Sequence, residues 1–116
     1  MTIEKLREFA LSLPGATEDI KWENHLCFNV GGKMFLVTSP DSVPITASFK
    51  TDDDNFDALT TRDGIIPAPY MARNKWVLVD DLKRFSEAEW KQLARHSYEL
   101  VFSRLTKKLQ NEISGR

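Results

Sequence analysis

Apolar and polar residues alternate from residue 26 to residue 37, and this pattern predicts a β-hairpin. Gly31 and Gly32 lie at its centre, where two residues with positive φ angles close a two-residue turn. That turn sets the expected cross-strand pairs, which are Val30 with Lys33, Phe28 with Phe35 and Leu26 with Val37. One face, expected to be core, then carries Leu26, Phe28, Phe35 and Val37. The other face is half apolar, and it carries Cys27, Asn29, Met34 and Leu36.

Apolar residues at helical spacing predict two helices that pack on this sheet. The first is expected over residues 3–13, before Pro14 and Gly15. The second begins at Ser86, which forms a capping box with Glu89, and is expected to continue to about Leu109. Its apolar arc is wider than one packing face needs, so the helix either wraps a concave sheet or also contacts a partner.

Shorter segments supply the remaining elements. Strands are expected at residues 17–25, 43–49 and 76–79, the first of them at the sheet edge. Three aspartates at residues 52–54 favour the start of a helix that ends near residue 61, and residues 64–70 read as a loop. The expected order is α-β-β-β-β-α-β-α. This order predicts a two-layer α+β fold, with an antiparallel sheet of about five strands and helices mainly on one face.

Length and composition indicate a single small domain. The chain has 116 residues, which suits one domain over residues 1–116, with a polar tail from about residue 110. Its net charge is −1, so it lacks the overall basic excess of most nucleic-acid modules. The single cysteine allows no internal disulfide. We expect no signal peptide and no membrane-spanning helix, and therefore a cytoplasmic protein.

The chain resembles the MmcQ/YjbR family of small bacterial proteins. The resemblance is carried, in the family's order, by LPGATE (13–18), FNVGGKMF (28–35), YMARNKW (70–76) and HSYELV (96–101), followed by Leu105. It implies a fold like that of secretion chaperones and of frataxin-like CyaY proteins. It also implies a DNA-binding role, a label that the family carries for its double-wing shape. It implies no catalytic residues.

The sequence holds no catalytic or metal-binding signature. Cys27 lies within a predicted strand, where a cysteine is usually an inert packing residue. His96 falls on the polar side of the last helix, and neither a serine elbow nor a phosphate-binding glycine loop is present. The acidic residues around Glu18 and the aspartates at 52–54 lack the spacing of a calcium loop. We therefore expect a protein that is not an enzyme and has no cofactor and no metal.

Basic residues at two predicted turns suggest contact with nucleic acid. Lys33 lies at the hairpin turn, and Arg73 and Lys75 precede the last strand. Lysine and arginine at such tips suit phosphates, and Trp76 could stack on an unpaired base. DNA is therefore the expected partner. In the alternative interpretation, the three cations are ordinary turn charges and Trp76 belongs to the core.

Two further hypotheses involve aromatic residues. Tyr98 and Phe102 flank the wide apolar arc of the last helix and could dock a protein partner or a second copy of the chain; otherwise a curved sheet absorbs the arc. A small-molecule pocket could also form between the sheet and residues 67–70, lined by Tyr70, Arg73 and Trp76. Arg73 would then bind an anion. The alternative there is a rigid loop that closes the sheet edge.

Overall fold

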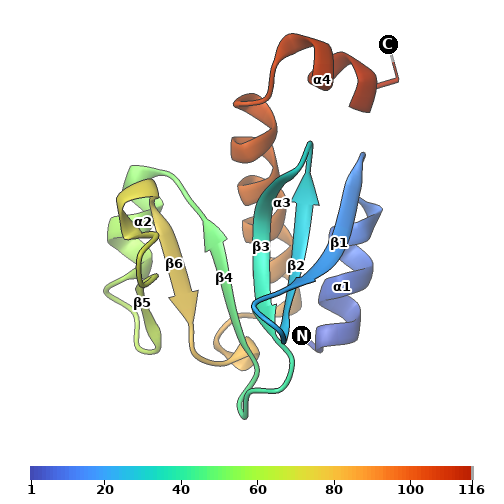
Figure 1. The fold of residues 1–116 in the computed structure, drawn as a ribbon. Coiled ribbons are helices and arrows are strands. Elements are labelled where there is room, and N and C mark those ends of the chain that lie inside the picture. Colours follow the sequence, from blue (N-terminus) through green and yellow to red (C-terminus); the bar gives the residue numbers. More distant parts are fainter. Residues whose placement is uncertain (116) are drawn as a thin grey trace.

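The computed structural model describes residues 1–115, which form a six-stranded antiparallel sheet with helices on one face (Figure 1). The strands lie in the order β1-β2-β3-β4-β6-β5. They are β1 (Ala16–Lys21), β2 (His25–Val30), β3 (Lys33–Ser39), β4 (Thr46–Lys50), β5 (Ile65–Pro67) and β6 (Trp76–Val79). The helices are α1 (Ile3–Ser12), α2 (Asp53–Leu59), α3 (Glu87–Ser103) and α4 (Lys107–Ile113), with 3-10 turns η1 (Ala72–Asn74) and η2 (Leu82–Arg84). The two-layer α+β prediction is confirmed.

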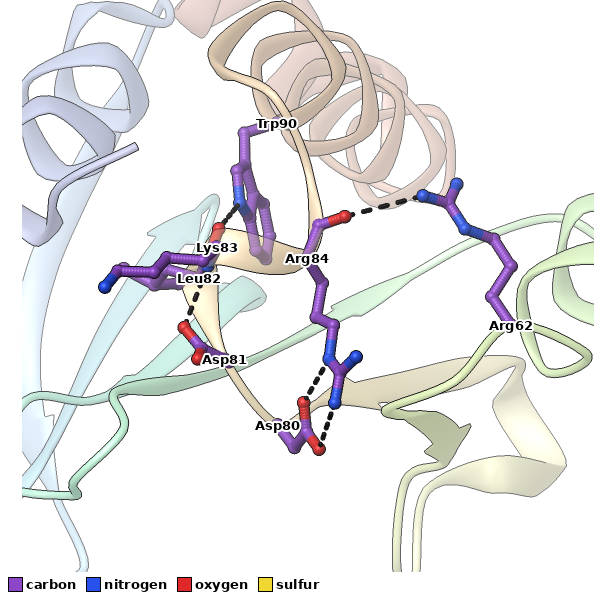
Figure 2. Close-up of polar contacts among 7 residues, drawn as sticks. All are labelled: Arg62, Asp80, Asp81, Leu82, Lys83, Arg84 and Trp90. Carbon is purple, nitrogen blue, oxygen red and sulfur yellow. Dashed lines mark hydrogen bonds and ion pairs between the residues drawn. The ribbon is translucent and has the colours of Figure 1, made fainter.

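The main core lies between the sheet and helices α1 and α3, which stand behind the sheet in Figure 1. Its fully buried side chains come from both layers, and include Leu6, Phe28, Leu36, Phe49, Val77 and Trp90. Trp90 also fixes the connection from β6 to α3, because its indole N–H donates a hydrogen bond of 2.6 Å to the carbonyl oxygen of Leu82 in η2 (Figure 2). Beside it, the Arg84 guanidinium binds both carboxylate oxygens of Asp80, at 2.8 and 3.2 Å.

The hairpin turn forms as predicted, but the pairing beyond it differs. Gly31 and Gly32 have φ angles of 58° and 80°, and Val30 pairs with Lys33. A β-bulge then shifts the register, so that Phe28 pairs with Leu36 and Leu26 with Thr38. Because β3 carries one extra residue at the bulge, Phe35 and Leu36 both enter the main core and Val37 turns to the opposite face. The expected pairing of Phe28 with Phe35 is therefore wrong.

The single C-terminal helix expected up to about Leu109 is two helices. α3 ends at Ser103, and Thr106 caps α4 by accepting a hydrogen bond from the backbone N–H of Leu109. The chain then crosses the end of the sheet (Figure 1). Leu105 covers Gly31, and Ile113 covers Gly15, so closely that a Cβ at either glycine would lie 2.6 or 2.8 Å from a side-chain carbon.

Residues 64–70, expected to be a loop, contribute the edge strand β5, which raises the strand number to six. We call the sheet face not covered by α1 and α3 the open face. The loop after β5 covers part of it, where Cys27, Val37, Ala68 and Trp76 form a small second core. None of the helices described within residues 1–115 could span a lipid bilayer.

Candidate functional site

Basic side chains gather at one end of the sheet. The β2–β3 turn, the end of β4 and the start of β6 lie at this end because their strands are antiparallel, and α3 ends and α4 begins there too (Figure 1). Five exposed cations stand there, none of which forms an ion pair within residues 1–115: Lys33, Arg73, Arg104, Lys107 and Lys108. We call these five residues the cationic end.

Two other lysines at this end are engaged by the protein itself. Lys50 is buried, and its Nζ donates to the carbonyl oxygen of Asn74 at 2.5 Å. Burial, and to a smaller extent the charge of Arg104, lower the pKa of Lys50. Lys75 is half-buried, with its Nζ 3.9 Å from a carboxylate oxygen of Asp53 and 4.9 Å from the ring centre of Phe56. Both lysines therefore form contacts within the domain that compete with the binding of any ligand.

A hollow of about 620 Å³ lies beside these two lysines and the start of α2. Its lining combines the cations Lys50, Lys75 and Arg104 with the three aspartates of residues 52–54. Asp52 caps α2 through the N–H of Asn55 at 2.8 Å and also lies 2.9 Å from Nε2 of His96. The Asn55 N–H is the main reason that the pKa of Asp52 lies below its usual value. Since the charges in the hollow are balanced, the exposed cationic end is the better phosphate surface.

Of the four residues predicted to contact nucleic acid, Lys33 and Arg73 are exposed and Lys75 is partly engaged. Trp76 is different, because only 6% of its surface is exposed. It packs with Cys27, Val37 and Ala68 in the second core. Its ring is therefore not available for stacking on a base. The interpretation that placed Trp76 in the core describes its position correctly.

Tyr98 and Phe102, predicted to contact a partner, pack within the domain. Tyr98 is buried, meets the ring of Phe35 edge-on at 5.4 Å, and donates its hydroxyl to the carbonyl oxygen of Pro14. Phe102 is half-buried and stacks on Tyr98 at 5.9 Å. The sheet and α1 therefore account for the width of the apolar arc without a second protein.

A second candidate site is a groove on the open face, of about 570 Å³. We call it the open-face groove. It lies between the β1–β2 turn and the loop after β5, and its lining is Trp22, His25, Val37, Ser39, Thr46, Ser48, Ala68, Pro69, Tyr70, Met71 and Leu78. Of the residues predicted for a pocket at this loop, Tyr70 lines the groove, whereas Arg73 and Trp76 do not.

The groove's rims carry two exposed aromatic residues in an unusual backbone conformation. Trp22 has a φ of 48° and is 60% exposed; Tyr70 has a φ of 65° and is fully exposed. Sequence reasoning missed Trp22 because the turn that presents it contains no glycine, although an apolar residue between two charged neighbours was a signal of exposure. His25 meets the Trp22 ring edge-on at 5.7 Å.

Cys27 and the Arg7–Glu18 pair have structural roles. Burial raises the pKa of the Cys27 thiol, which keeps it in the unreactive thiol form. Arg7 binds Glu18 through two hydrogen bonds of 2.7 and 2.6 Å, so that this carboxylate joins β1 to α1. Within residues 1–115, no group of three or more histidine, cysteine or acidic side chains is arranged to hold a metal ion.

Comparison with known proteins gives a family and two similar structures. A family model described as YjbR matches residues 11–100. The crystal structure of the Deinococcus radiodurans protein DR2400, a DUF419 domain, is 26% identical with a TM-score of 0.87, over 97% of this chain and 88% of that one. A Pseudomonas syringae protein structure shares the fold at 18% identity with a TM-score of 0.71, over 87% of this chain and 99% of that one. No curated protein matches the sequence.

Proposed function

The chain belongs to the YjbR family, and on that basis we propose that it is a cytoplasmic protein without enzymatic activity that binds nucleic acid through the cationic end. The observation that supports the proposal most is the position of Lys33 and Arg73. Both are exposed, form no ion pair with described residues, and lie at the same end of the sheet, Lys33 at the β2–β3 turn and Arg73 in η1 before β6. Exposed cations at loop tips are well placed to reach phosphates.

The chemistry of this end favours contact with the phosphate backbone rather than with bases. The buried Trp76 offers no stacking surface there. The positive charge at this end is increased by Arg104, Lys107 and Lys108. It is reduced by the negative charge of Asp53 beside Lys75. With so few free cations we expect weak binding that depends little on sequence and is strongest at low salt.

The protein-interaction role suggested by the apolar arc of α3 has less structural support. Tyr98 and Phe102, its expected contact residues, bind one another, Phe35 and the chain around Pro14. A partner that used these rings would have to displace contacts that stabilise the domain. We therefore give nucleic-acid binding precedence.

A binding experiment with matched variants tests the proposal. Fluorescently labelled duplex and single-stranded DNA are titrated with the protein at low salt, and with the double variant Lys33→Ala/Arg73→Ala. We expect binding by the wild type and at least a tenfold loss in the variant, since both side chains are exposed and the fold does not depend on them. Lys83→Ala is the control, because Lys83 is an exposed lysine in η2, at the opposite end of the sheet (Figure 1). The proposal is wrong if the wild type does not bind, or if Lys83→Ala weakens binding as much as the double variant.

A further inference from the structure

We propose that the open-face groove binds an uncharged heteroaromatic ring of the nucleobase type. The proposal rests on the groove's two aromatic rims, its hydroxyl-bearing floor and a lining in which His25 is the one acidic or basic side chain. It is separate from the proposed role of the cationic end, because neither Lys33 nor Arg73 lines the groove.

The rims supply two aromatic surfaces from segments far apart in the sequence. Trp22 stands on the β1–β2 turn and Tyr70 on the loop after β5, and both line the same groove. Neither residue contributes much to the core, since Trp22 is 60% exposed and Tyr70 fully exposed. Aromatic rings in such positions are suited to stack on a planar ligand.

Trp22 and Tyr70 both have left-handed backbone conformations, and each lies in a turn that contains no glycine. Left-handed φ angles are rare for bulky residues, because they cost free energy relative to ordinary conformations. At Trp22 and Tyr70 this cost accompanies an exposed side chain, so that packing in the core does not compensate for it. Strain of this kind is typical of ligand-binding positions.

The floor offers hydrogen-bonding groups beside apolar ones. Ser39 and Thr46 are directly paired across β3 and β4, and Ser48 lies between Val37 and Leu78 on the neighbouring strands. None of these three hydroxyls forms a side-chain hydrogen bond with the described residues. Each can donate and accept, and the edge of a nucleobase presents donors and acceptors of the same kind.

The lining of the open-face groove disfavours a charged ligand. Apart from His25, it contains no acidic or basic side chain. A volume of about 570 Å³ is within the range of pockets for small molecules. A nucleoside therefore matches the groove better than a free phosphate does, and a phosphate attached to the ring would have to lie outside.

Tryptophan fluorescence gives a direct readout. Of the three tryptophans, Trp76 is 6% exposed and Trp90 is fully buried, so Trp22 is the one exposed reporter. Titration with adenosine, an uncharged nucleoside, is expected to quench Trp22 emission along a saturating curve. Inorganic phosphate is expected to leave the emission unchanged.

Variants separate binding in the groove from collisional quenching. Tyr70→Asn keeps the Trp22 reporter and suits a left-handed backbone, so the fold should persist and the apparent Kd for adenosine should rise about tenfold. Ser48→Ala should weaken binding by a smaller factor. Ile20→Asn is the control, because Ile20 is an exposed apolar residue outside the groove, and it should leave the apparent Kd for adenosine unchanged. The double variant Lys33→Ala/Arg73→Ala should bind adenosine like the wild type, which keeps this test independent of the cationic end.

The source of the ring is identified by comparing adenosine with a short single strand of deoxyadenosine. If the ligand is a free nucleoside, adenosine and the strand should bind with equal affinity per ring. If the ligand is a base within a nucleic acid, the strand should bind more tightly than adenosine. That increase in affinity should be lost in Lys33→Ala/Arg73→Ala. Quenching that does not saturate, or that is the same in Tyr70→Asn, overturns the proposal. So does a groove that binds only an extended apolar peptide.

Discussion

The hydroxyl of Ser97 on α3 donates a hydrogen bond of 2.6 Å to the carbonyl oxygen of Phe35, at the bulge in β3. It also accepts one of 2.9 Å from the backbone N–H of Lys50. The two strands and the helix are thus joined through one buried side chain. Such a group is needed because a bulge leaves backbone polar groups without their strand partners.

Ser97→Ala should therefore be strongly destabilising. It leaves a buried N–H and a buried C=O without partners, which costs about 1–3 kcal/mol for each group, so we expect a loss of about 3 kcal/mol in the free energy of unfolding. Urea denaturation measures it. Ser103→Ala is the control, because Ser103 is exposed and its hydroxyl bonds only within its own helix. Similar losses in the two variants would contradict this role of Ser97.

The two glycines of the hairpin turn should differ in their tolerance of alanine. Both have positive φ, so Gly32→Ala, which has open space around its Cβ, should cost about 1 kcal/mol from the backbone alone. Gly31→Ala should cost clearly more, since its Cβ would lie 2.6 Å from Cδ1 of Leu105. Thermal or urea unfolding of the two variants gives the difference between their free energies of unfolding. That difference measures the packing of the C-terminal segment on the hairpin. Equal costs would show that Leu105 does not lie there in solution.

Tyr70→Asn should raise the free energy of unfolding. Asparagine adopts the left-handed conformation more readily than tyrosine does, and the tyrosine ring is exposed, so relief of strain should give up to about 1 kcal/mol. Urea denaturation checks this gain. Tyr70→Phe keeps the ring and should leave stability unchanged. A less stable Tyr70→Asn protein would mean that the ring contributes to the fold.

The contribution of Asp52 should depend on pH. Because the folded-state pKa of Asp52 is depressed, chiefly by the N–H of Asn55, its ionised form stabilises the fold above the unfolded pKa. That stability is lost as the pH falls through the folded pKa. An asparagine at this position would still cap α2, so the difference in stability between the wild type and Asp52→Asn should narrow below about pH 4. Urea denaturation from pH 5 to strongly acidic pH tests this, and a difference that stays constant or widens would exclude it.

Local patterns in the sequence predicted the elements whose signals are local. Gly31-Gly32 identified the turn, and Ser86 with Glu89 identified the start of α3, because turns and caps depend on a few adjacent residues. The bulge was not predictable in this way. Its partner Ser97 lies 62 residues from Phe35, and alternation alone gives no sign of an extra residue.

The candidate sites were likewise predictable only where they depend on local sequence. The position of Lys33 at the hairpin turn, and that of Arg73 just before the last strand, were predictable from local patterns. The burial of Trp76 was not, because it depends on the loop that carries Ala68 and Met71 across the open face. The open-face groove was not predicted, for a related reason. Trp22 and Tyr70 line one groove only because the loop after β5, a strand that was not predicted, lies over the sheet.

The salt dependence of DNA binding tests the central claim most directly. For the wild type, we predict that the logarithm of the association constant falls linearly with the logarithm of salt concentration, with a slope of about −2 to −4, set by the few free cations. Lys33→Ala and Arg73→Ala should each make that slope shallower by about one. Binding that is insensitive to salt, or a slope that neither variant changes, would contradict phosphate contact by the cationic end.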